Sequence, residues 1–401
     1  MVVFKFGEYW DTLTFFLVLI LGIVIYILTK IGAVRKKPFS FFLLFALLLF
    51  VYTFRNYTHG ADTGTYVVSF RESLTFTNPI NESYEPFFKI FTFLVRKITD
   101  NYNIYFLISG ILICGSYIYF LKTFWMEKQG FLLTVLVAVE FFYDLNIMRY
   151  ALAHSLFLIS LCLLIKKKNL WAILLSLCSV LFHYTAIITL FFVLFYLLYI
   201  KCNKKKQITI SVLLIFVMTA GAVAVHFLIG GTRYAKYFDT ISPTLLGNWK
   251  QLFFGIIAFA YLLFIPNKTK KETIATVCGL FGLSLVPFVL INGAYRITYF
   301  FLIPEFYLLQ TVIDRFTKKT IRLPWNILSA AFIVFYYLFD LSRRSQDYGF
   351  KYELAPFLNE TITVFCITLF LAFLIMCVYK KKPLKKKYKK IIRLRKYLIN
   401  S

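Results

Sequence analysis

Arginines stand at the ends of apolar segments throughout this chain, where their side chains could act together on an anion. A planar guanidinium with five donors holds a phosphate or carboxylate through two parallel hydrogen bonds, whereas a lysine mainly supplies a point charge. Three of these arginines, Arg149, Arg233 and Arg296, each lie within one turn of a tyrosine and are the main candidates for binding. The arginines that the predicted membrane topology places on the outer face are Arg55, Arg71, Arg96, Arg149, Arg233, Arg296, Arg343 and Arg344.

Two carboxylates and one histidine could move protons beside such an anion. Asp62 follows His59 in the segment His59-Gly60-Ala61-Asp62-Thr63-Gly64-Thr65-Tyr66, and Glu85 begins Glu85-Pro86-Phe87-Phe88. Either could take a proton from an attacking hydroxyl, and the sequence does not choose between them. His183 could donate to a phosphate or shuttle a proton.

Simpler interpretations exist for each of these residues. Asp62 and Glu85 could be solvated loop acids or helix caps, and a lone histidine at a helix end is more often structural. Arg149 could pair with Asp144 or Glu140, because an ionisable group in an apolar helix needs a partner. Arginine and tyrosine at helix ends also serve as membrane anchors.

Familiar motifs of soluble enzymes are missing from the chain, which has no P-loop, no GxSxG, no HExxH and no GxGxxG. The seven cysteines lie singly, without CxxC spacing, and there are four histidines. These patterns predict neither a disulfide nor a metal site, and no cofactor is expected.

The composition is that of a multi-pass membrane protein. Of 401 residues, 60% are hydrophobic and 16% charged, with a mean hydropathy of +0.75. The net charge of +27 would suggest a nucleic-acid partner in a soluble protein, but here the basic residues interrupt apolar spans. Membrane topology explains most of the lysines, so nucleic acid is not an expected partner.

Apolar segments long enough to cross a bilayer recur along the chain, and with two hairpins they predict about thirteen transmembrane helices in an all-α fold. The single spans are expected at 12–29, 38–54, 103–122, 207–229, 250–266, 273–291, 296–314, 323–340 and 359–379.

The apolar stretches 131–165 and 170–200 are each too long for one span and slightly short for two. One helix over 170–200 would run about 46 Å and strand a lysine cluster outside the roughly 30 Å core. Two short hairpins are therefore predicted, with their polar tips at Asp144 to Arg149 and at His183-Tyr184-Thr185 pointing outward.

These spans form a single transmembrane domain, 1–379, with the N-terminus outside and a basic cytoplasmic tail at 380–401. The outer loops are 55–102, 230–249 and 341–358, and an amphipathic interfacial helix is predicted near 86–98 with Lys89, Thr92 and Arg96 as its polar stripe. Lysines gather on the inner side, as the positive-inside rule requires. That rule does not explain the arginines outside. The tail could bind anionic lipid, although topology alone accounts for it.

The chain resembles the EpsG family, related to the Wzy-type polymerases of O-antigen and capsule. The resemblance spans roughly residues 40–310 and rests on short pieces in order. They are Gly60 to Tyr66, Glu85 to Phe88, Met148-Arg149-Tyr150-Ala151-Leu152-Ala153, Leu181-Phe182-His183-Tyr184-Thr185-Ala186, Arg233-Tyr234 with Tyr237, and Tyr295-Arg296-Ile297-Thr298-Tyr299-Phe300.

The resemblance implies a glycosyltransferase of GT-C type in the bacterial cytoplasmic membrane. It would transfer a growing glycan from undecaprenyl diphosphate to the hydroxyl of a lipid-linked repeat unit on the outer face, without a metal. Such a protein contacts membrane lipids and works with a flippase and a chain-length regulator.

The resemblance also implies roles for particular residues. Asp62, Glu85 and His183 are the candidate catalytic residues, and the residues expected to bind substrate or diphosphate are Arg55, His59, Arg149, Arg233, Tyr234, Arg296 and Tyr299. Three alternatives remain open from the sequence: a ligase-like transferase, a flippase for lipid-linked oligosaccharide, and a polysaccharide acyltransferase.

Overall fold

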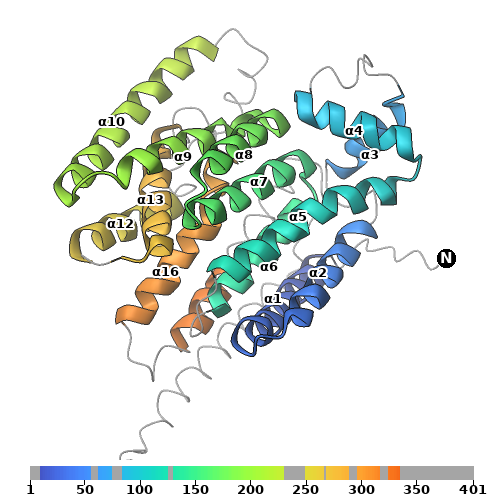
Figure 1. Cartoon of the computed structure of the whole chain (residues 1–401), viewed down its shortest axis with the longest axis horizontal. Coiled ribbons are helices and arrows are strands. Elements are labelled where there is room, and N and C mark those ends of the chain that lie inside the picture. The colour runs from blue at the N-terminus through green and yellow to red at the C-terminus, as the bar shows by residue number, and fades with distance from the viewer. Residues whose placement is uncertain are drawn as a thin grey trace, which may run out of the picture. The chain divides into compact units, whose positions relative to one another are not determined.

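A computed structural model describes residues 10–55, 62–74, 84–124, 130–229, 249–265, 268–288, 296–316 and 324–334, and every regular element among them is a helix (Figure 1). The chain divides into two compact units. One comprises residues 16–312 and contains the candidate site, and the other comprises 1–15 and 313–401. The second unit's described residues are 10–15, 313–316 and the apolar helix Pro324–Val334.

Apolar helices dominate the unit 16–312 and establish a membrane protein. The helices α5 (Tyr102–Phe124), α7 (Met148–Ile165) and α10 (Lys204–Ile229) and the segment Lys270–Phe288 contain stretches that are long and apolar enough to cross a bilayer. Shorter apolar helices include α2 (Pro38–Thr53) and α12 (Trp249–Phe264). The total of thirteen spans, and the GT-C comparison, stay predictions. The N-terminal helix α1 covers Trp10–Val34.

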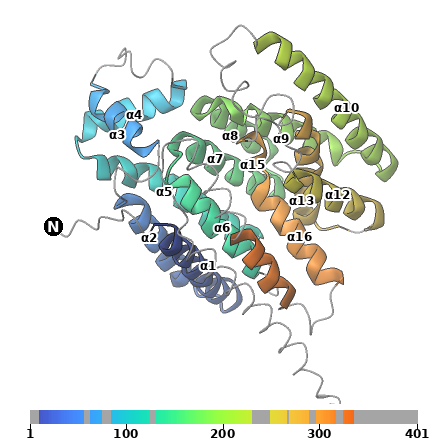
Figure 2. The same cartoon turned by 180° about the vertical axis from the view of Figure 1, so that it is seen from behind.

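The two predicted breaks are confirmed. The stretch 131–165 divides into α6 (Gly130–Asp144) and α7, and 170–200 divides into α8 (Asn169–Phe182), a 3-10 turn η2 (Tyr184–Ala186) and α9 (Ile187–Tyr199). His183 stops α8 because its backbone is extended, with φ −156° and ψ 116°. α8 packs against both α7 and α9 (Figures 1 and 2).

Hydroxyl side chains tie these three helices together. The Ser160 and Ser176 hydroxyls lie 3.0 Å apart between α7 and α8, and Ser179 and Thr189 lie 3.0 Å apart between α8 and α9. All four side chains are buried. Small polar residues allow close helix approach and hydrogen bonding in an apolar medium, where hydrophobicity alone does not hold helices together.

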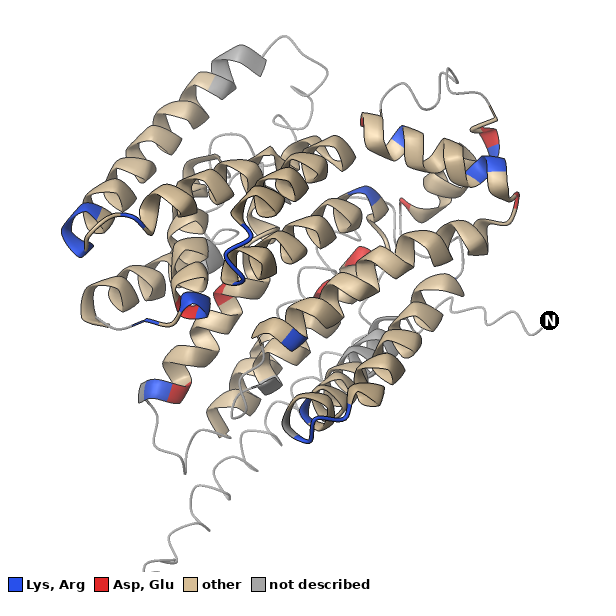
Figure 3. Ribbon diagram, viewed as in Figure 1, with Lys and Arg blue, Asp and Glu red and all other residues tan. Residues whose placement is uncertain are grey.

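Lysine-rich turns lie at one end of these helices and the candidate site at the other. The turns α1–α2, α7–α8 and α9–α10, and the turn between α12 and α13 (Lys270–Ser284), each carry lysines and lie on the lower and left side of the view in Figure 3. Lys270 Nζ donates to the Ile165 carbonyl at 3.4 Å and Lys204 Nζ to the Leu263 carbonyl at 2.7 Å, which joins turns distant in sequence. α7 and α8 run from this end to the site, so a bilayer between the two ends fits the predicted topology.

The segment after α2 folds into α3 (Thr63–Glu72) and α4 (Pro86–Ile98), which confirms the predicted helix at 86–98. The predicted polar stripe was wrong in one position. Thr92 is buried and its hydroxyl lies 3.1 Å from the Tyr105 hydroxyl of α5, because α4 packs with its Phe88, Thr92 and Val95 face inward. The exposed face includes Ile90, Leu94 and Ile98.

The span predicted at 296–314 was also wrong, because the chain forms a short α15 (Arg296–Tyr299) and then α16 (Leu302–Phe316). Pro304 explains the break, since proline lacks an N–H and its ring clashes with the carbonyl four residues earlier. The helix α13 (Lys270–Ser284) begins with Thr269 and Glu272 in a reciprocal cap.

Candidate functional site

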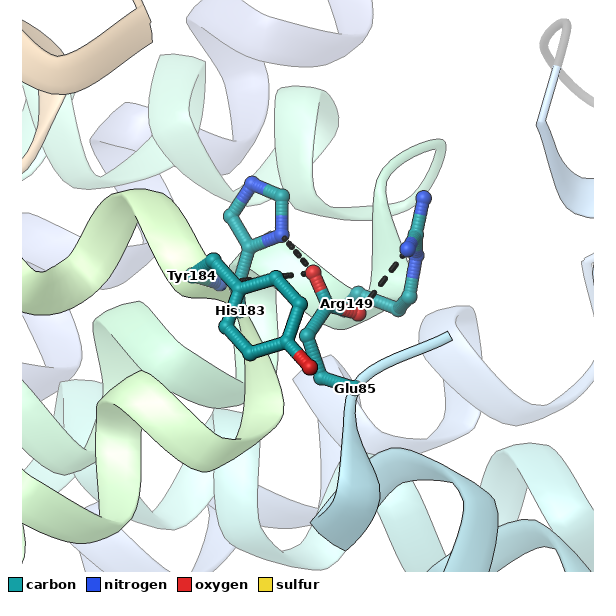
Figure 4. A network of polar contacts seen from close by, with 4 residues as sticks. All are labelled: Glu85, Arg149, His183 and Tyr184. Atoms are coloured by element: carbon teal, nitrogen blue, oxygen red, sulfur yellow. Dashed lines mark hydrogen bonds and ion pairs between the residues drawn. The ribbon is translucent and has the colours of Figure 1, made fainter. Parts of the chain in front are cut away.

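Glu85 lies at the centre of the site and immediately precedes α4. Pro86 at the first helical position fixes the start of that helix, and the Glu85 side chain does not cap it. The carboxylate instead turns toward α7 and η2 and is 4% exposed (Figure 4).

Three donors from two other segments surround this carboxylate. Arg149 Nη1 donates to Oε2 at 2.9 Å, while His183 Nδ1 lies 3.0 Å and the Tyr184 backbone N–H 3.3 Å from Oε1 (Figure 4). Both oxygens are thus engaged. We call Glu85, Arg149 and His183 the site triad.

Burial alone would raise the pKa of Glu85, but the hydrogen bond from His183 and the charges of Arg149 and His183 outweigh it and lower the pKa to about 2. The carboxylate is therefore ionised at neutral pH. A group with so low a pKa is a poor general base but a strong orienting partner.

His183 has one ring nitrogen committed and one directed elsewhere. Because the ionised Glu85 can only accept, the Nδ1 of His183 carries the proton in their hydrogen bond. In the neutral ring Nε2 then bears the lone pair, and it points away from Glu85 (Figure 4). This is the geometry in which a carboxylate fixes the tautomer of a histidine base.

Arg149 is the second residue of α7, so its guanidinium extends from a helix end toward the loops. The Tyr84 ring lies 4.7 Å from its Cζ, and Arg149 also interacts with the Tyr66 hydroxyl. The side chain is 26% exposed, and its Nε has no hydrogen-bond partner among the described residues. From the sequence, Asp144 and Glu140 were the candidate ion-pair partners of Arg149. In the structure Arg149 forms an ion pair with Glu85.

Tyr84 and Tyr66 were missed as site residues by sequence reasoning. Tyr84 directly precedes Glu85, and Tyr66 ends the quoted segment that begins at His59. Their rings lie 6.4 Å apart, and both contact Phe88. An aromatic residue beside each quoted motif was the available signal, but tyrosines are too common in this chain for it to stand out.

Asp62 lies near the triad without joining it. Its backbone N–H donates to Asn146 Oδ1 at 3.0 Å, and Thr63 Oγ1 donates to the Leu145 carbonyl at 3.2 Å. These bonds attach the start of α3 to the α6–α7 turn, three residues before Arg149. The Asp62 side chain is half-buried and does not cap α3.

Arg55 is placed differently from the triad. It is 8% exposed and lies between the rings of Tyr52 and Phe106, 4.0 and 3.9 Å from its Cζ, and its Nη1 donates to the Tyr52 carbonyl. No contact joins it to Glu85 among the described residues.

The remaining predicted residues are only partly described. Tyr299 packs edge-on against Tyr143 with ring centroids 5.5 Å apart, and α15 contacts η2. Arg296 begins α15, so its backbone lies near the site, but its side chain is outside the described residues. His59, Arg233 and Tyr234 also lie outside the described residues.

The arrangement can hold an anion and remove a proton from a hydroxyl nearby. Arg149 supplies donors beyond those used by Glu85, and His183 supplies a base oriented by a fixed charge. Among the described residues no group of three or more histidine, cysteine, aspartate or glutamate side chains could hold a metal ion.

Comparison with known proteins gives one match. No curated protein and no solved structure matches the chain. The model of the EpsG family matches residues 39–359, a range that contains every member of the triad. The chain therefore belongs to the EpsG family, a family of Wzy-like polymerases.

Proposed function

We propose that the protein polymerises a bacterial surface polysaccharide, such as O-antigen, capsule or exopolysaccharide, on the outer face of the cytoplasmic membrane. The growing glycan leaves its undecaprenyl diphosphate and joins a hydroxyl of a lipid-linked repeat unit. Family membership supports the polymerase role. The observation that carries the mechanism is Glu85, which holds Arg149 and His183 on its two carboxylate oxygens.

The geometry favours His183 over Glu85 or Asp62 as the general base. His183 Nε2 takes the proton of the attacking hydroxyl while its oxygen forms the new bond to the anomeric carbon. The bond from that carbon to the diphosphate breaks, and the electron pair stays on the diphosphate. Glu85 holds the imidazole in orientation and stabilises the imidazolium that forms, as the carboxylate of a catalytic triad does.

Arg149 stabilises the leaving diphosphate in this proposal. Charge accumulates on that group as the glycosidic bond breaks, and donors already in position stabilise it without reorganisation. Arg149 has the Glu85 ion pair and the Tyr84 ring to keep it in place. Arg296 and Arg233 are proposed to add charge, and no metal is assigned to the step.

The test is reconstitution of the purified protein with a lipid-linked repeat unit as sole substrate. A ladder of products is expected. Transmembrane movement of unchanged substrate would instead identify a flippase, and transfer only to a different acceptor would identify a ligase-like enzyme.

His183→Asn tests the assigned base within the same assay. Asparagine keeps a donor near the Nδ1 position for Glu85 but offers no equivalent of Nε2. We expect a folded protein whose ladder formation falls roughly 10²–10⁴-fold, the usual range for a lost general base. A normal ladder from His183→Asn would overturn the assignment of His183.

A further inference from the structure

A second carboxylate and histidine lie beneath the site triad, in the interior of the same unit. Asp144 ends α6, His154 lies in the second turn of α7, and Tyr117 faces them from α5. The Tyr117 hydroxyl donates to Asp144 Oδ2 at 2.6 Å, and His154 Nδ1 lies 4.0 Å from the same oxygen. The side chains of Asp144 and His154 are both 0% exposed.

These buried groups have few other partners. Asp144 Oδ1, both His154 ring nitrogens and the Tyr150 hydroxyl lack hydrogen bonds within the described part of the chain. Glu140, also buried, lies one turn earlier on α6. From α5 and α2 the other ionisable neighbours of Asp144 are Cys114 and Tyr52.

The pair bridges the turn that carries the site. Between Asp144 and His154 lie Leu145 and Asn146, which hold the start of α3, and Arg149 of the triad. The Tyr150 ring stacks on His154 at 5.5 Å and meets His183 edge-on at 6.3 Å, so it separates the two histidines.

We propose that Asp144 and His154 position the α6–α7 turn, and through it Arg149, for the reaction. This positioning role rests on the proposed function. Asp144 and His154 are positioning residues here, because buried groups beneath Tyr150 act on the substrate through Arg149.

Ladder formation tests the positioning. The double variant Asp144→Asn with His154→Gln replaces both ionisable side chains with neutral polar ones, so it should match the wild type in stability while kcat falls roughly tenfold. Ser160→Ala with Ser176→Ala is the matched control, since it removes a buried hydrogen-bonded pair farther along α7 and should leave kcat unchanged. A stable double variant with wild-type kcat would overturn the positioning role.

Tyr117→Phe covers the case in which the double variant fails to fold. It removes only the hydroxyl that donates to Asp144, and a lower kcat without loss of folded protein is expected. Wild-type kcat in Tyr117→Phe would count against the positioning role. If the wild type itself makes no ladder, the proposed function fails, whereas with an active wild type the outcomes above bear on the positioning role alone.

Discussion

Two carboxylate–histidine pairs occupy neighbouring regions of this protein, and their surroundings give them different chemistry. In Glu85–His183 the two groups lie 3.0 Å apart, and Arg149 and a backbone N–H complete the carboxylate's bonds. In Asp144–His154 they lie 4.0 Å apart with 0% exposure, and a tyrosine hydroxyl is the hydrogen-bond donor present.

The difference shows that residue type does not decide function here. Glu85 is ionised because Arg149 and the donors of His183 and Tyr184 surround it. Its histidine partner can therefore accept a proton from outside and return it. The Asp144–His154 pair has no such excess of positive charge and no exposed atom. It cannot meet a substrate. Arg149 is the residue through which the first pair reaches the anion.

After loss of the His183 base itself, a change at Arg149 should give the largest effect, and it tests the surroundings of the first pair. Arg149→Lys keeps the charge but loses the planar fork that serves Glu85 and the diphosphate together. We expect ladder formation to fall about 10²–10³-fold, with single repeats as the main species. Arg71→Lys, on the exposed side of α3, is the matched control. Normal-length polymer from Arg149→Lys would remove the diphosphate role from this residue.

Glu85→Gln should give the next largest effect. Glutamine can accept the hydrogen bond from His183 but carries no charge to stabilise the imidazolium. We expect kcat to fall about 10²-fold while KM for the lipid-linked unit changes little. A rise in KM with unchanged kcat would instead place Glu85 in substrate binding.

The difference in stability between the wild type and Glu85→Gln should shrink as the pH falls into the acid range. The Glu85 pKa is lowered from 4.5 to about 2, so its interactions stabilise the fold above about pH 4.5 and lose that contribution as pH falls toward 2. The contribution at neutral pH is on the order of 3 kcal/mol. Unfolding of both proteins between neutral pH and pH 2 checks it, and a gap in Tm that stays constant over this range would refute the lowered pKa.

Sequence reasoning found the elements of the site but not the contacts between them. The helical spacing of Lys89, Thr92 and Arg96 among apolar residues was enough to place α4. The lysine clusters were enough to divide 170–200 at His183. The bond between Glu85 and His183 joins positions 98 apart, and no local pattern encodes such a distance.

Two buried side chains have a shared physical cause. Thr92 was expected in the polar stripe of α4 and Arg55 among the arginines of the outer face, yet each finds a partner inside, Tyr105 for the first and two aromatic rings for the second. A polar side chain can be buried wherever tertiary packing supplies a donor, an acceptor or a ring face. Periodicity along one helix does not contain that information.

Removal of the Tyr84 ring should have the smallest effect of these changes. It separates what the ring contributes to holding Arg149 from what the Glu85 ion pair contributes. An arginine over an aromatic face gains about 0.5–1 kcal/mol at a partly exposed site, which corresponds to roughly 2–5-fold. Tyr84→Leu should weaken ladder formation by about that factor, and Tyr84→Phe should have little effect because the ring remains. An equal loss in both variants would mean that the hydroxyl, and not the ring face, is what Arg149 requires from this position.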